Sequence, residues 1–92
     1  MRRRAKVDGN HAEIVAAFRK AGWKVLSLAE LGNGVPDLLV MRWEEHNGNP
    51  FMTRWFLVEV KQPKGKLTKD QERFRAEWPV QVVRTVDDAL SL

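Results

Sequence analysis

An acidic and a basic side chain, two residues apart, close an apolar run in the middle of the chain. Residues 55–58 are apolar, and Glu59, Val60 and Lys61 follow them, with Pro63 just beyond. Because side chains alternate across a strand, Glu59 and Lys61 are expected on the same face. Ionised groups at the end of a buried strand are unfavourable unless they pair or bind a ligand. The spacing therefore predicts either a strand-end ion pair or a reactive site.

A second carboxylate, Asp37, is brought toward Glu59 by the expected pairing of two strands. Asn47-Gly48 is a strong hairpin signal, and a turn there, or one residue later, pairs positions whose numbers sum to about 95 or 96. Asp37 then falls opposite Val58 or Glu59, and opposed side chains lie about 5 Å apart. Two such carboxylates repel unless one is protonated or both bind a cation. Mg2+ prefers oxygen ligands of this kind, so the pair predicts a hard divalent cation.

The residues before Asp37 set the direction in which its strand begins. Gly34 permits unusual backbone angles and Pro36 fixes its own φ. Gly34-Val-Pro36-Asp37 is therefore either an ordinary turn or a device that aims Asp37.

Gln71 has two candidate roles in the second expected helix. Leu67, Phe74 and Trp78 share one apolar stripe at helical spacing, and Gln71 falls in its middle. An amide on an inner face needs a hydrogen-bond partner. Thr68 and Gln71 also match a capping box, so the pattern supports capping and a site role equally.

Glu13 carries the same ambiguity in the first expected helix. It stands three residues after Asn10, which matches a capping box. It could instead reach Asp37 and Glu59 as a further metal ligand. The pattern alone favours capping.

A basic loop follows the second carboxylate directly. It is either a solvated loop or a phosphate-binding segment beside a metal site, and its lysines are Lys64, Lys66 and Lys69. Residues 1–7 form a basic arm, which either contacts a nucleic-acid backbone or is a disordered tail, and its arginines are Arg2, Arg3 and Arg4.

The elements that must position these residues follow the order α-β-β-β-α-β. A helix is expected from Asn10 to about Ala21, and a second from Thr68 to about Trp78. Strands are expected at residues 23–27, 35–43, 51–61 and 80–84, and a final helical turn at 85–92. This order predicts an α/β (α+β) sandwich, with helices on a mixed sheet, in a single domain spanning residues 8–92 after the arm.

Composition excludes several functional classes. The 92 residues carry a net charge of +4, which favours a polyanionic partner, and no cysteine. The two histidines stand alone, which argues against a zinc site. No Ser/His/Asp arrangement, P-loop or dinucleotide loop is present. Neither a long apolar run nor a signal-peptide pattern occurs, so we expect a soluble, intracellular protein with no membrane contact.

Taken together, these motifs resemble the PD-(D/E)xK nuclease superfamily and, more narrowly, its VRR-NUC (virus-type replication-repair nuclease) domain. The match covers about residues 8–90 and rests on Glu13, Gly34-Val-Pro36-Asp37, Glu59-Val60-Lys61 and the run 63–71. The resemblance implies a restriction-endonuclease-like αβββαβ core. It implies a catalytic set of Asp37, Glu59 and Lys61, with Glu13 and Gln71 as further site residues.

The resemblance also implies a cofactor and a substrate. Mg2+ or Mn2+ would be held by Asp37, Glu59 and the Val60 carbonyl, with Glu13 as a further ligand. The expected activity is hydrolysis of DNA phosphodiester bonds, on branched DNA as in Holliday junction resolvases. Alternatives are a flap, nicking or restriction-like nuclease, or a non-catalytic nucleic-acid-binding module.

The short members of this family act as homodimers, so a homodimer is expected. Aromatic residues flanking the hairpin, Trp43, Trp55 and Phe51, are candidates for its interface or for the core. The expected setting is the cytoplasm, in a bacterial host or encoded by a phage.

Overall fold

The computed structural model describes residues 9–92, except for the side chains of His46 and of residues 49–52. The elements are α1 (His11–Lys20), β1 (Lys24–Ser27), β2 (Leu38–His46), β3 (Asn49–Val60), α2 (Lys69–Glu77), β4 (Val80–Val83) and α3 (Val86–Leu90). The expected order of elements is confirmed. Among the described residues, no helix is both long and apolar enough to cross a membrane.

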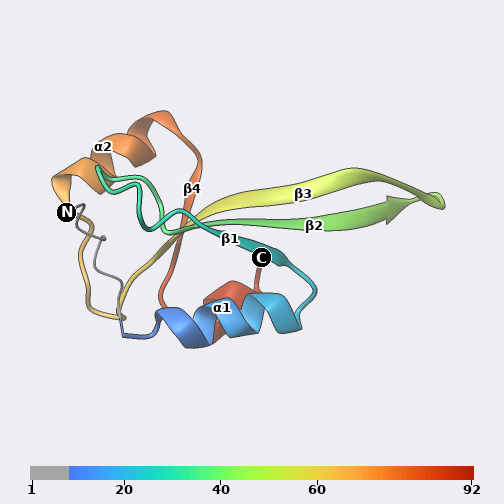
Figure 1. Ribbon diagram of the computed structural model, residues 1–92, viewed down its shortest axis with the longest axis horizontal. Helices are drawn as coiled ribbons and strands as arrows, with labels where there is room; N and C mark the ends of the chain where they lie inside the picture. Colours follow the sequence, from blue (N-terminus) through green and yellow to red (C-terminus); the bar gives the residue numbers. More distant parts are fainter. Residues whose placement is uncertain (1–8) are drawn as a thin grey trace.

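The four strands form one mixed sheet in the order β1-β2-β3-β4 (Figure 1). β1 pairs with β2 and β2 with β3 in antiparallel fashion, whereas β3 and β4 run parallel. The parallel pair requires a crossover, and α2 lies within that connection. The predicted α+β class with a mixed sheet is confirmed.

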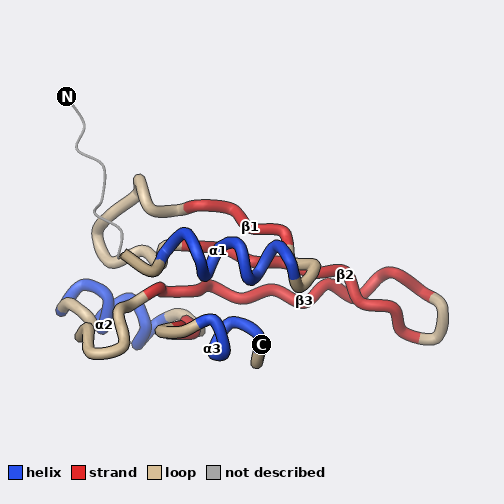
Figure 2. Tube along the Cα trace, turned by 90° about the horizontal axis from the view of Figure 1, so that it is seen from below, coloured by secondary structure: helices blue, strands red, loops and turns tan. Residues whose placement is uncertain are grey.

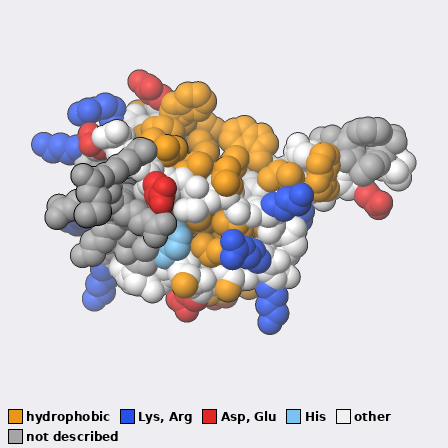
Figure 3. Space-filling view, viewed as in Figure 1, with side chains coloured by type: hydrophobic (Ala, Val, Ile, Leu, Met, Phe, Trp, Pro, Cys, Tyr) orange, Lys and Arg blue, Asp and Glu red, His pale blue; other side chains and the backbone are white. Residues whose placement is uncertain are grey.

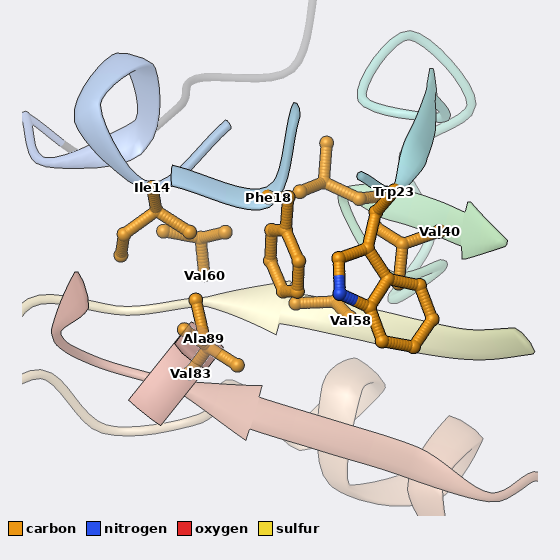
Figure 4. Packing of buried hydrophobic residues seen from close by; sticks show 9 residues of the cluster. Ile14, Phe18, Trp23, Val40, Val58, Val60, Val83 and Ala89 are labelled. Atoms are coloured by element: carbon orange, nitrogen blue, oxygen red, sulfur yellow. The ribbon is translucent and has the colours of Figure 1, made fainter. Parts of the chain in front are cut away.

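Helices cover the two faces of the sheet unequally. α1 and α3 lie together on one face, and α2 lies on the other (Figures 1 and 2). The core is on the α1 side, where Ile14 and Phe18 of α1 meet Val58 and Val60 of β3 (Figure 4). Ala89 of α3 belongs to the same cluster. α2, in contrast, contains no buried residue.

The β2–β3 hairpin fixes the register at the sheet's centre. Asn47 and Gly48 turn with φ of 54° and 77°. Leu38 pairs with Val58 and Met41 with Trp55, so the numbers of paired residues sum to 96 from Leu38 to Glu44, and to 95 at the His46–Asn49 pair beyond a register shift. This agrees with the predicted register and places Asp37 opposite Glu59. The hairpin projects beyond the helices and gives the molecule extents of 46 × 27 × 25 Å (Figure 1).

β2 begins and ends later than residues 35–43. It starts at Leu38 because Pro36 cannot donate to the ladder, and it reaches His46 because the turn takes only two residues. β3 correspondingly begins at Asn49 rather than at residue 51.

The predicted capping box of α1 is wrong. Asn10 is the N-cap residue of α1, but its side chain makes no capping hydrogen bond. Its Nδ2 instead donates to the carbonyls of Lys61, at 3.0 Å, and Arg84, at 2.9 Å. Those carbonyls lie just beyond the ends of β3 and β4, where the ladder no longer satisfies them. The backbone N–H of Glu13 therefore receives no acceptor from the Asn10 side chain, as a capping box would require.

The predicted inner stripe of α2 is only partly buried. Phe74 is half-buried, but Trp78 is 53% exposed and stacks on Phe74 at a centroid distance of 6.0 Å. α2 covers one end of the sheet, so its last turn has little sheet surface to pack against.

Candidate active site

Asp37 is held at both its backbone and its side chain. The Leu28 N–H donates to the Asp37 carbonyl at 2.7 Å, which ties the residue to the loop after β1. The Val60 N–H donates to Asp37 Oδ2 at 2.8 Å. The carboxylate thus replaces a ladder acceptor at the end of β3, and its position is fixed relative to Glu59 and Lys61 on either side of Val60.

Glu59 is the buried charged side chain of the described region, with 3% of its surface exposed. Val58 and Val60 face the core on the α1 side, so Glu59 faces α2. It lines a narrow crevice with Gln71 and Arg75 of α2 and with Pro36. The crevice contains no space for a water molecule. A carboxylate in this environment requires polar or cationic partners.

Gly34 determines how closely the loop before Asp37 approaches α2. Its φ is 81°, a conformation that favours glycine. A Cβ at this position would lie far inside contact distance of the Asp70 carbonyl in the first turn of α2. The glycine therefore does more than aim Asp37, because it brings the loop against the helix that carries Gln71.

Gln71 forms the predicted capping box and also lies beside Glu59. Its Oε1 accepts from the Thr68 N–H at 2.9 Å, and its own N–H donates to Thr68 Oγ1 at 3.2 Å. The capping box is thus complete. The same side chain lines the Glu59 crevice. The cap leaves the Gln71 amide nitrogen available to a neighbour, and its role in the site stays a prediction.

Arg75 is a site neighbour that the sequence reasoning missed. It lines the Glu59 crevice one helical turn after Gln71. The sequence does contain a signal for Arg75, because it stands four residues after Gln71 and residues at this spacing share a helix face. A guanidinium there is a natural partner for a buried carboxylate.

Lys61 leaves the sheet beside β4. Its N–H donates to the Val83 carbonyl at 3.0 Å, and its carbonyl accepts from Asn10. The residue is half-buried, whereas the loop lysines Lys64, Lys66 and Lys69 are exposed. The predicted arm contacts of Arg2, Arg3 and Arg4 lie outside the described residues.

Glu13 is not brought together with the other carboxylates. It is exposed on α1 and lines a separate hollow with Gln62, Arg84 and Asp87. Within residues 9–92, no three acidic or histidine side chains form a group that could hold a metal ion. The carboxylates that the register brings to one end of the sheet are those of Asp37 and Glu59 alone.

This donor set fits a hard divalent cation. Asp37 and Glu59 supply carboxylate oxygens, and the cation would have the mainly oxygen environment that Mg2+ and Mn2+ prefer. Because the Glu59 crevice excludes water and Asp37 is half-buried, a hydrated cation would be held on the Asp37 side. Lys61 follows Glu59 by two residues, and strand alternation predicts that its side chain adds a positive charge beside such a site.

One of three comparisons with known proteins gives a match. The family model of the VRR-NUC domain matches residues 4–81 of the 92. Neither the curated proteins nor the solved structures include a match.

Proposed function

Because the chain belongs to the VRR-NUC family, whose members are PD-(D/E)xK-type nucleases and generally depend on divalent metal, we propose that it is a Mg2+- or Mn2+-dependent endonuclease for branched DNA. The observation that supports the site most strongly is the Val60 N–H to Asp37 hydrogen bond of 2.8 Å. This bond places one carboxylate at the end of β3, beside the buried Glu59 and just before Lys61.

The proposed reaction is hydrolysis of a phosphodiester bond. Asp37, Glu59 and the Val60 carbonyl would hold the cation. When bound, such a cation polarises a phosphate oxygen and makes a coordinated water more acidic. Lys61 stabilises the negative charge that grows on the phosphate oxygens and orients the attacking water. Gln71 fixes the Lys61 ammonium or that water through its amide.

The DNA backbone is proposed to follow the loop after Lys61. Lys64, Lys66 and Lys69 are exposed there and carry positive charge without base-reading geometry. The arginines of the arm, Arg2, Arg3 and Arg4, would extend the same contact along the DNA. Residues 8–92 would then form one catalytic domain, and binding would weaken steeply with salt.

A cleavage assay tests this proposal. A synthetic four-way junction is compared with linear duplex, flap and single-stranded DNA, with Mg2+, with Mn2+ and with chelator, for wild type and Lys61→Ala. Metal-dependent paired cuts in the junction that Lys61→Ala abolishes are the expected result. Cutting of flaps or plain duplex instead would support nuclease activity but contradict a preference for junctions. Binding without any cleavage would leave the non-catalytic alternative.

Symmetric cutting of a junction needs two active sites, and we propose that the chain forms a two-fold homodimer. The sheet face that α2 leaves uncovered supports this. Trp43 and Trp55 lie on the Glu59 face of the hairpin, 57% and 51% exposed. Half-buried apolar side chains continue this face toward the body, namely Leu39, Met41 and Leu57. Figure 3 shows hydrophobic side chains extending from α2 toward the hairpin.

Charge and area favour a second copy over DNA on this surface, here called the apolar sheet face (Leu26, Leu39, Met41, Trp43, Trp55, Leu57 and Trp78). The hairpin arginines point to the opposite face, where Arg42 lies over Trp23 and Arg54 over Phe56. DNA-binding surfaces are much more positively charged than this. The exposed halves of the three tryptophans offer roughly 300 Å² per copy. With the leucines and Met41, two copies would bury about 1,000 Å², which is the minimum expected of a biological interface.

A further inference from the structure

Two side chains far from Lys61 in the sequence hold the backbone of Lys61 and of the loop after it. Asn10 Nδ2 donates to the Lys61 carbonyl at 3.0 Å and to the Arg84 carbonyl at 2.9 Å. One amide thus links the end of β3, the end of β4 and the start of α1. The bonds span 51 and 74 residues of sequence, so no local turn accounts for them.

Arg84 holds the segment that follows. Its Nη1 donates to the Gln62 carbonyl at 2.9 Å and to the Gly65 carbonyl at 2.5 Å. Gly65 N–H also donates to the Gln62 carbonyl at 2.9 Å, which closes a turn. The backbone of Arg84 is fixed in turn, because its N–H donates to Asp88 Oδ2 at 2.9 Å.

We propose that Asn10 and Arg84 form a clamp that positions the Lys61 ammonium and the loop lysines for the reaction. This inference rests on the proposed catalytic role of Lys61. The side chain of Lys61 has four rotatable carbons, so the direction of its ammonium depends first on where its Cα is held. Neither Asn10 nor Arg84 reaches the crevice that Glu59 lines, and both act as positioning residues.

The local chemistry of Asn10 supports a role beyond helix capping. An N-cap asparagine ordinarily accepts a hydrogen bond from the first turn of its own helix. Here the amide donates to two distant carbonyls, and its Oδ1 is buried with no hydrogen-bond partner. The Asn10 side chain therefore joins the ends of β3 and β4 and makes no capping hydrogen bond to α1.

Single-turnover kinetics with saturating junction DNA test the clamp. Asn10→Asp keeps the shape but replaces the donor with an acceptor that faces two carbonyls. Arg84→Met keeps the length and removes both donors. Each should lower the cleavage rate constant by roughly 10- to 100-fold, because small misplacements of reacting groups have effects of this size. DNA affinity should stay within about twofold of that of the matched controls, since the loop lysines remain.

Matched controls separate positioning from charge. Gln81→Glu introduces the charge change of Asn10→Asp on an exposed β4 residue, and Arg19→Met repeats Arg84→Met on the exposed surface of α1. Both should retain the wild-type rate constant. Arg84→Lys, which restores a donor, should recover part of the lost rate. Asn10→Ser serves as a milder variant if Asn10→Asp does not fold.

One further measurement distinguishes positioning from mere stabilisation. Amide hydrogen exchange should accelerate in residues 61–65 of the clamp variants while the β2–β3 ladder stays protected. Variants that melt earlier but cleave at the wild-type rate would overturn the proposal.

The clamp and the proposed function fail in different ways. If wild type does not cleave, or if Lys61→Ala cleaves like wild type, the proposed function is wrong. If Lys61→Ala is inactive while the clamp variants match their controls, the nuclease assignment holds and the clamp is rejected.

Discussion

At the scale of single residues, Asp37 has a structural role and a proposed role in metal binding. One carboxylate oxygen accepts from the Val60 N–H and so ends the ladder between β2 and β3. The register places the same group opposite Glu59, which is 3% exposed. Two neighbouring carboxylates repel one another unless one is protonated or a cation is shared. The structural role and the proposed metal role of Asp37 can therefore be separated by removing the charge while keeping the acceptor.

Asp37→Asn makes that separation. The amide oxygen can still accept from Val60, so the fold should persist with a similar melting temperature. Loss of one negative charge should weaken Mn2+ binding by about tenfold or more, the size typical of altered metal ligands and their supports. Titration calorimetry measures the affinity, with the exposed Asp87→Asn as the control for net charge. Unchanged Mn2+ affinity would show that Asp37 and Glu59 do not share a cation.

At the scale of elements, the site depends on how α2 sits against the loop before β2. α2 contributes no buried residue, so hydrophobic burial holds it weakly. Its first turn is instead fixed by the Thr68–Gln71 capping box and by the close approach of Gly34 to Asp70. Gln71 and Arg75 reach the Glu59 crevice only while this contact persists.

Gly34→Ala tests the contact. The added Cβ meets the Asp70 carbonyl, and the residue also keeps φ at 81°, which strains a side chain. The free energy of unfolding should fall by about 2–4 kcal/mol, as for other substitutions that combine a clash with backbone strain. Urea denaturation measures this change.

Gly32→Ala is the matched control for Gly34→Ala. Gly32 also has a positive φ, 62°, but a Cβ there would meet nothing within 4 Å. Only the backbone strain remains, at about 1 kcal/mol. An equal decrease in the free energy of unfolding of the two variants would mean that α2 does not contact Gly34 closely.

At the scale of the whole molecule, the uneven cover of the sheet shapes what the protein can bind. α1 and α3 cover the inner part of one face and α2 covers one end of the other, while the outer half of the hairpin projects beyond all three helices (Figures 1 and 3). Exposed aromatic surface of this extent is typical of interaction sites. The same face carries Glu59 at its inner end, so a two-fold axis through the hairpin would set a fixed spacing between two active sites.

The double variant Trp43→Ser/Trp55→Ser tests the dimer. Light scattering should give wild type a mass near twice the chain's 10.6 kDa and the variant a mass near 10.6 kDa. Leu90→Ser is the control, because Leu90 is 57% exposed but lies on α3, on the other face. A monomeric wild type would reject this interface and leave the nuclease proposal standing. Phe51, also predicted for the interface, lies outside the described side chains.

Local interactions and strand periodicity were decided by the sequence itself. The Asn47-Gly48 turn predicted pairs summing to 95 or 96, and the observed sum is 95 next to the turn and 96 along the rest of the hairpin. The Thr68–Gln71 capping box forms as its spacing predicted. Both depend on residues within a few positions of each other, so near neighbours suffice to specify them.

Long-range competition for hydrogen bonds and space was decided only by the tertiary structure. Asn10 and Glu13 match a capping box, yet Asn10 binds the carbonyls of Lys61 and Arg84. Which carbonyls remain unpaired becomes defined only once β3 and β4 have come together. Likewise, the exposure of Trp78 and the close contact between Gly34 and Asp70 depend on the position in which α2 packs on the sheet. A helical period indicates which side chains share a face, but not how much of the sheet that face will meet.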